Sequence, residues 1–236
     1  MRDRAVRTPR SALLTAVLAA VVTIGALVFV FVARPHPAPP AGSAGEPAAV
    51  PPSATTTCGS EPCRQLAAMT VGGQPVVLLA DASGGSGRLR FGPEPGTVFE
   101  LTIGELGARL DANSLRCIDG STAACLVRGQ VDGGAYGEVL AGRGGLWHDP
   151  GKPYFADAGT LTLGDVNADG VPDVIVVRHE CPGAESGTPK CEAAPVLAQV
   201  YDLGGETLGC TRKVTSPSDL RGWPEVRLTR ADLRSC

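Results

Sequence analysis

The sequence lacks the short motifs that usually carry catalysis. It contains no G-x-S-x-G nucleophile elbow, no H-E-x-x-H metal-binding motif and no glycine-rich phosphate loop. His148 precedes Asp149 and His179 precedes Glu180, but adjacent residues of a strand point to opposite faces, so neither pair forms a ready dyad. We therefore interpret both histidines as surface or structural residues and predict that the chain is not an enzyme.

Positive charge is also scarce in the part of the chain that can fold. Without residues 1–34, which hold five Arg and one Asp, the chain has 16 basic and 23 acidic residues, a formal net charge of −7. Nucleic acids and anionic lipid surfaces bind proteins largely through basic side chains. The composition therefore argues against both kinds of partner for this region.

Aromatic residues make up only 4% of the chain. Trp147, Tyr154, Phe155 and Trp223 could line a carbohydrate or peptide groove, because such sites favour aromatic faces with a few polar groups. In a chain with so few aromatic rings we interpret them instead as anchors of the hydrophobic core.

The N-terminal region has a long stretch without charge. Residues 12–33 contain no charged side chain and would span roughly 33 Å as a helix, which matches the hydrocarbon core of a bilayer. Four arginines precede this stretch and only Arg34 follows it closely, which predicts a cytoplasmic tail at residues 1–11. The alternative is a cleaved signal peptide, but its apolar region is usually only about 7 to 15 residues long. We predict an uncleaved signal anchor in the cell membrane.

Residues 34–57 form a predicted linker. Seven prolines lie between Pro35 and Thr57, mixed with Ala, Gly, Ser and Thr. This composition cannot bury a core and favours extended conformations. We expect a spacer that carries residues 58–236 away from the membrane.

No cysteine precedes residue 58, and all eight lie in the predicted exported domain. An even number of cysteines confined to such a domain indicates disulfides in an oxidising compartment. The spacing favours four local pairs, and a zinc site is the alternative, although the chain has no C-x-x-C pair. The predicted pairs are Cys58 with Cys63, Cys117 with Cys125, Cys181 with Cys191, and Cys210 with Cys236.

Helical periodicity is scarce after residue 58, where Gly and Pro recur and short apolar runs lie between turn residues. The expected class is mainly β, and the expected strands are 75–80, 87–91, 97–102, 124–130, 137–141, 159–163, 173–178 and 196–203. Thr102 and Thr229 are each followed three residues later by an acid, which predicts a one-turn helix at each. Similar patterns near residues 71–79 and 167–177 suggest degenerate repeats of turn and strand.

One segment has metal-binding chemistry. Residues 164–177 read GDVNADGVPDVIVV and place oxygen-bearing side chains at Asp165, Asn167, Asp169 and Asp173, with Gly170 at the turn. Calcium takes six to eight oxygen ligands, and the carbonyl of Val171 would be a further one. An EF-hand needs Glu where Val176 stands, and the apolar run after Pro172 favours a strand. The loop is therefore expected to join two strands around calcium, and the alternative is a metal-free turn.

This segment resembles the calcium loop of an FG-GAP repeat, the integrin α-chain type of β-propeller repeat, also similar to VCBS repeats. The resemblance covers about 14 residues, in one complete copy, and implies that Asp165, Asn167, Asp169, Val171 and Asp173 hold calcium. The 179 residues from Cys58 onward are too few for a full integrin-like propeller. We expect a small or degenerate β-propeller-like domain.

These features together favour a noncatalytic binding or interaction module, stabilised by calcium and displayed outside the cytoplasm on a membrane anchor. Its partner would be an envelope protein or a polysaccharide. The alternatives are a structural component of the cell envelope and a cell-wall hydrolase.

Overall fold

The structure, a computed structural model, describes residues 56–184 and 186–236, which belong to one compact unit beginning at Pro52. Within these residues the chain forms four antiparallel sheets and only short helical turns, so the described part is mainly β, as predicted. The predicted tail, membrane helix and all but the last two residues of the linker lie outside the described residues. Among the described residues, no helix is long and apolar enough to cross a membrane.

The first four-stranded sheet is a meander in which consecutive strands pair. Its first two strands are joined by Gly72 and Gly73, which have φ of 56° and 76°. Positive φ at both positions is the conformation of a tight hairpin turn that glycine adopts without strain. The strands are β3 (Arg64–Val71), β4 (Gln74–Ala80), β5 (Gly87–Phe91) and β6 (Thr97–Leu101).

The second sheet repeats this order around a long central hairpin of β8 and β9. Both β10 and β11 pair with the same edge of β9, at its two ends. The strands are β7 (Leu115–Ile118), β8 (Ala123–Val131), β9 (Gly134–Arg143), β10 (Leu146–His148) and β11 (Tyr154–Ala156).

The third sheet is again a four-stranded meander, and the predicted calcium loop joins its first two strands. Its strands are β12 (Leu161–Gly164), β13 (Asp173–His179), β14 (Val196–Tyr201) and β15 (Thr207–Cys210). The remaining elements are the small sheet of β1 (Thr57–Cys58) and β2 (Glu61–Pro62), the helix α2 (Pro189–Glu192), and the 3-10 turns η1 (Pro217–Asp219) and η2 (Arg230–Asp232).

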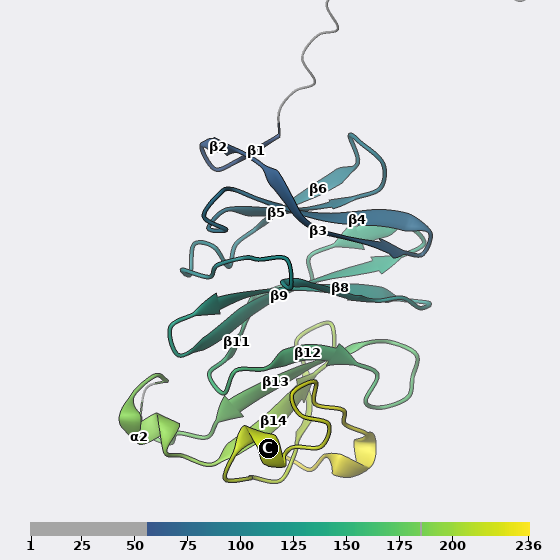
Figure 1. The fold of residues 1–236 in the computed structure, drawn as a ribbon. Coiled ribbons are helices and arrows are strands. Elements are labelled where there is room, and N and C mark those ends of the chain that lie inside the picture. The colour runs from purple at the N-terminus through teal and green to yellow at the C-terminus, as the bar shows by residue number, and fades with distance from the viewer. Residues whose placement is uncertain (1–55, 185) are drawn as a thin grey trace, which may run out of the picture. The chain divides into compact units, whose positions relative to one another are not determined.

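Figure 1 shows the three larger sheets stacked face to face, with the second sheet in the middle. Alternate side chains of β8 pack against the first sheet and against the third, because successive side chains of a strand point to opposite faces. Val127 and Leu140 pack with Leu78 and Leu89 of the first sheet. Leu126 packs with Leu161, Val174 and Val176 of the third. Burial on both faces explains why the first five residues of β8 are all apolar.

The second and third sheets approach each other closely at Gly137 of β9. A Cβ atom added there would lie 1.7 Å from Cδ2 of Leu161 in β12. Only glycine leaves room for this leucine, which is fully buried. The contact fixes the spacing of the two sheets beside β11.

The stack does not close into a ring within the described residues. The outer face of the third sheet, with Ile175, Val177 and Val200, packs against Val226 and Leu228 of the C-terminal segment, residues 211–236. On the outer face of the first sheet, Val77 and Leu79 pack against the Cys58–Cys63 disulfide. Each end of the stack is thus covered by a segment that lies next to it in sequence.

The four disulfides of the structure join the cysteines in the local order that their spacing predicted. The bonds are Cys58–Cys63, Cys117–Cys125, Cys181–Cys191 and Cys210–Cys236, and no described cysteine is free. The last bond closes a separation of 26 residues and holds the C-terminal segment against β15.

A buried carboxylate links the first two sheets. Glu138 of β9 is 2% exposed, and its Oε2 accepts hydrogen bonds from the backbone N–H of Thr102 at 2.8 Å and from the Thr102 hydroxyl at 3.1 Å. Burial raises the pKa of Glu138, against the effect of these hydrogen bonds, and the charge of Asp149 adds to the increase. The turn after β6 is therefore fixed by an acid from the neighbouring sheet.

This arrangement corrects one of the two predicted helical turns. Glu105 does not cap the segment at Thr102, which forms hydrogen-bonded turns instead of a helix. At Thr229 the prediction is confirmed, since the Thr229 N–H donates to Asp232 at 2.8 Å and η2 follows.

Candidate functional site

The acidic loop, residues 165–173, connects β12 to β13 and is held by hydrogen bonds to its own side chains. Asp165 accepts from the N–H of Gly170 at 3.0 Å and from that of Asp169 at 3.2 Å. Asp169 accepts from the N–H of Val171 at 2.8 Å. Gly170 has φ of 79°, where glycine is favoured, and Ala168 also has positive φ at 63°. The predicted turn at Gly170 is thus present.

Asp173 closes the loop from its buried side. It is 2% exposed, and its Oδ2 accepts the N–H of Val166 at 2.9 Å. Burial raises the pKa of the Asp173 carboxyl, and the negative charges of Asp169 and Asp165 add to this effect. The loop therefore gathers three carboxylates around a short backbone segment.

These carboxylates do not converge on one point as they stand. Within the described residues, one group of at least three acidic, His or Cys side chains has ligand atoms within 4.8 Å of one another, and it consists of Asp157, Cys181 and Cys191. Both cysteines belong to one disulfide, so neither is available as a thiolate ligand. That group is not a calcium site.

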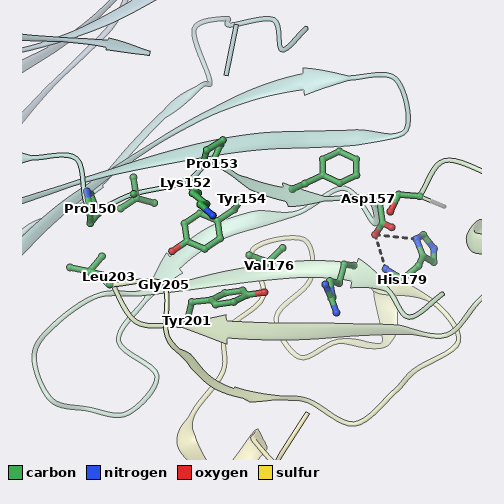
Figure 2. Close-up of a pocket in the computed structure, with 16 residues that line it drawn as sticks. Pro150, Lys152, Pro153, Tyr154, Asp157, Val176, His179, Tyr201, Leu203 and Gly205 are labelled. Atoms are coloured by element: carbon green, nitrogen blue, oxygen red, sulfur yellow. Dashed lines mark hydrogen bonds and ion pairs between the residues drawn. The ribbon is translucent and has the colours of Figure 1, made fainter. Parts of the chain in front are cut away.

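A cleft of about 580 Å³ lies between the second and third sheets, beside β11, β13 and β14. Figure 2 shows the rings of Tyr154 and Tyr201 next to each other at its wall, with Val176 alongside. Pro150, Leu203 and Gly205 lie at one end, and Asp157 and His179 at the other. The cleft thus has an aromatic middle and a polar end.

The two tyrosines come from different sheets. Their ring centroids are 5.3 Å apart with an interplanar angle of 53°. Burial is the main cause that raises the pKa of both phenols, and the charge of Asp202 contributes for Tyr154. Both hydroxyls therefore carry a proton at neutral pH and can donate and accept hydrogen bonds.

Two basic side chains also line the cleft, Lys152 and Arg178. Neither forms an ion pair or side-chain hydrogen bond with another described residue. Arg178 lies near enough to Tyr201 that its charge acts to lower the pKa of that phenol, against the larger effect of burial. Lys152 and Arg178 are both exposed, and a guanidinium or an ammonium in such a place can bind an anion.

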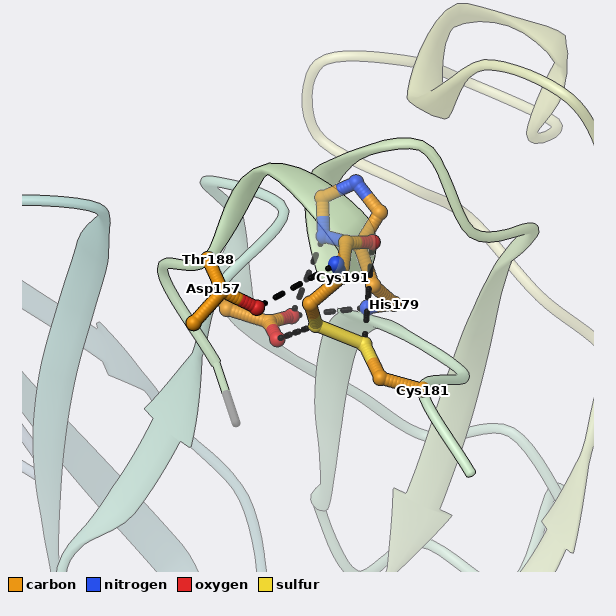
Figure 3. Close-up of polar contacts among 5 residues, drawn as sticks. All are labelled: Asp157, His179, Cys181, Thr188 and Cys191. Carbon is orange, nitrogen blue, oxygen red and sulfur yellow. Dashed lines mark hydrogen bonds and ion pairs between the residues drawn. A yellow bond between two sulfur atoms is a disulfide. The ribbon is translucent and has the colours of Figure 1, made fainter. Parts of the chain in front are cut away.

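Asp157 and His179 form the fixed polar end of the cleft, shown in Figure 3. Asp157 Oδ1 accepts the backbone N–H of His179 at 2.7 Å and lies 3.5 Å from its Nδ1. Sγ of Cys191 is 3.7 Å from Asp157 Oδ2, a contact without a proton because that sulfur is in the Cys181–Cys191 disulfide. The disulfide and α2 thus hold this end in place.

The sequence-predicted aromatic residues divide between core and cleft. Trp147 stacks on Phe91 at a centroid distance of 3.9 Å, between the first and second sheets, and Trp223 packs on the core under the C-terminal segment, as predicted for core anchors. Tyr154 and Phe155 line the cleft. Tyr154 also packs on the core between the second and third sheets, and the ring of Phe155 packs on Tyr136 at a centroid distance of 4.7 Å, so both combine a packing role with a place at the cleft.

Sequence reasoning did not single out Lys152, Asp157, Arg178 or Tyr201. Each stands in an ordinary strand or turn context, and only the packing of two sheets brings them together. His179 was paired in sequence with Glu180, but the structure pairs Glu180 with Lys213 and His179 with Asp157. His148 and Asp149 are exposed, and Asp149 accepts the N–H of Gly151 at 2.9 Å.

No protein-family model matches the chain, and neither the curated proteins nor the solved structures include a significant match.

Proposed function

We propose that the chain is a noncatalytic binding module, displayed outside the cytoplasm on an N-terminal membrane anchor, and that its ligand occupies the tyrosine cleft. The observation that carries the proposal is the pair of contacting rings, Tyr154 and Tyr201, at the wall of a cleft between two sheets. Concave sites with aromatic walls and a few polar groups are typical ligand sites. The unpaired Lys152 and Arg178 supply such polar groups.

The four disulfides support a location in an oxidising compartment outside the cytoplasm. The apolar stretch at residues 12–33, with arginines before it, supports an anchor whose N-terminus is cytoplasmic. The proline-rich residues 34–57 would then carry the sheets away from the membrane. The partner would be an envelope polysaccharide or protein.

The three stacked meanders support a degenerate propeller-like domain. Each has four antiparallel strands in consecutive order, as propeller blades do, with β11 as a fifth strand in the second sheet, and each packs face to face with the next. The acidic loop joins the first two strands of the third meander, where the FG-GAP resemblance places a calcium loop. In this proposal the N-terminal and C-terminal segments replace the missing blades.

The acidic loop suits calcium by the chemistry of its donors. Asp165, Asn167, Asp169 and Asp173 offer side-chain oxygens, Val171 offers a carbonyl, and calcium prefers oxygen ligands. None of the three carboxylates has an ion-pair partner among the described residues. Bound calcium would offset their mutual repulsion, so its proposed role is stability.

Binding is tested on arrays of saccharides and peptides with the full-length protein, purified in detergent. The comparison is between the wild-type chain and the double variant Tyr154→Ala/Tyr201→Ala, with matched melting curves to show that the variant folds. We expect at least one ligand whose signal the double variant loses. Two results would reject the cleft as the binding site. In one, the wild-type protein binds no ligand on the arrays, and in the other the folded double variant binds the same ligand equally well.

A further inference from the structure

We propose that the cleft binds a saccharide whose sugar rings carry carboxylates, such as a uronic-acid oligosaccharide. This inference rests on the proposed binding function and names its ligand class. It combines three features of the cleft: two tyrosine rings in contact at its wall, two unpaired cations that also line it, and a polar end held by a disulfide.

The tyrosines provide the surface for a sugar ring. A pyranose has an apolar face of C–H groups, and aromatic side chains combine a flat apolar body with a polar tip. Tyr154 and Tyr201 pack against the core between the second and third sheets, which holds their rings in place in the absence of ligand. Both phenols are protonated at neutral pH and so can hydrogen-bond to sugar hydroxyls.

The charges favour an acidic sugar over a neutral one. The chain beyond residue 34 has a formal net charge of −7, yet Lys152 and Arg178 both line the cleft without a carboxylate partner in the described part of the chain. A guanidinium binds a carboxylate through two parallel hydrogen bonds, and an ammonium adds a point charge. A ligand carboxylate would occupy the place that a protein carboxylate usually takes.

Two carboxylates lie at or near the cleft, and backbone hydrogen bonds fix their orientation without removing their charge. Asp157 accepts the backbone N–H of His179 at 2.7 Å and faces its imidazole. Asp202, which acts on Tyr154, accepts the N–H of Glu206 at 2.8 Å. Asp157 lies at the polar end beside His179 and Asp202 is not among the lining residues, whereas Lys152 and Arg178 both line the cleft without an ion-pair partner among the described residues.

A proline-rich peptide is the competing occupant, because aromatic grooves also bind such peptides. Residues 35–57 of this chain are a candidate, but they contain a single acid, Glu46, and would leave at least one of the two cations without a partner. The unpaired charges therefore favour the acidic saccharide.

The test measures binding by titration calorimetry with the full-length protein in a detergent that contains no sugar. The probes are oligogalacturonate, a neutral gluco-oligosaccharide of equal length, polyglutamate, and a peptide of residues 35–57. We expect oligogalacturonate to bind on the order of tenfold more tightly than the neutral oligosaccharide, because each charged hydrogen bond adds roughly that factor. A higher salt concentration should reduce this difference in affinity between the acidic and the neutral oligosaccharide.

Two variants separate the contributions of charge and ring. Arg178→Gln, at an exposed residue, should weaken oligogalacturonate binding about tenfold and leave the neutral oligosaccharide unchanged. Tyr201→Ala should weaken both saccharides. The matched control is Arg212→Gln, which removes an exposed arginine outside the cleft and should change neither.

The outcomes distinguish this inference from the function on which it rests. Equal affinity for neutral and acidic saccharides, or preferred binding of the peptide, would overturn the inference while leaving a cleft-binding module. Polyglutamate that binds as tightly as oligogalacturonate would also overturn it, because charge alone would then explain the binding. If no probe binds and the arrays find no ligand that depends on Tyr154, both proposals fail.

Discussion

Asp169 has a central place in the acidic loop. Its backbone N–H donates to Asn167 and Asp165, and its own carboxylate accepts from Val171. Its charge also acts on the buried Asp173. A calcium ion at this loop would draw on the same oxygens, so Asp169 is the residue whose loss should affect metal binding most clearly.

We predict that calcium raises the melting temperature of the full-length protein and that Asp169→Ala abolishes this increase. A ligand that binds only the folded state stabilises it by about 2.7 kcal/mol at 100 times its Kd. Thermal unfolding with calcium and with chelator measures the effect. Asp132→Ala, at an exposed acid outside the loop, is the control and should keep the wild-type response. Identical melting with calcium and with chelator would mean that the loop is a metal-free turn.

The raised pKa of Glu138 predicts the direction in which folding stability changes with pH. Because burial raises its folded-state pKa, the unfolded chain loses this proton at lower pH than the folded chain does. The contribution of protonated Glu138 to the unfolding free energy is therefore fully present below the ordinary glutamate pKa of about 4.3. It is lost as the pH rises through the raised pKa of Glu138 in the folded state. Each unit of difference corresponds to about 1.4 kcal/mol.

Glu138→Gln removes this titration and keeps an oxygen that can accept from Thr102. The unfolding free energy of the variant minus that of the wild type should therefore increase as pH rises above about 4.3. Urea unfolding of both proteins between pH 4 and pH 8 measures the difference. A difference that stays constant or falls with pH would show that Glu138 is not held in a site that disfavours its charge.

At the scale of elements, the disulfides hold the covering segments at the two ends of the stack. The Cys210–Cys236 bond joins β15 to the segment that contributes Val226 and Leu228 to the core. The Cys58–Cys63 bond closes a separation of only five residues beside β4. A longer closed loop restricts the unfolded chain more.

We predict that the double variant Cys210→Ala/Cys236→Ala loses more unfolding free energy than Cys58→Ala/Cys63→Ala, by roughly 1.5 kcal/mol from loop closure alone. Loss of packing by the C-terminal segment would add to the difference. Urea unfolding of the two variants under non-reducing conditions gives both values. A larger loss from the shorter loop would contradict the proposed role of the C-terminal segment.

Most of the strands could be predicted from the sequence, because short apolar runs between Gly and Pro mark them. Residues 87–91 match β5 at both ends, and the other seven expected strands overlap β4, β6, β8, β9, β12, β13 and β14. The missed strands have exposed or polar residues or are very short, and they are β1, β2, β3, β7, β10, β11 and β15. Pairing with a neighbour, rather than their own composition, makes them strands.

At the scale of the whole molecule, the features that local sequence signals predict are different from those that form the candidate site. The acidic loop and the disulfide pairs depend on residues close in sequence, so their spacing could reveal them. The cleft depends on Tyr154 and Tyr201, which are far apart in sequence and meet only when two sheets stack. No periodicity of a single strand could have indicated that contact.

The central claim is that a ligand enters between the second and third sheets, and the three tyrosines of the chain allow a direct test. Tyr154 and Tyr201 line the cleft, whereas Tyr136 packs on the core between the first and second sheets. NMR of the tyrosine-labelled protein, titrated with the ligand that binds most tightly on the arrays, reports on all three rings. The account predicts large shifts for Tyr154 and Tyr201 and a smaller one for Tyr136. Binding that leaves the Tyr154 and Tyr201 signals unmoved would contradict it.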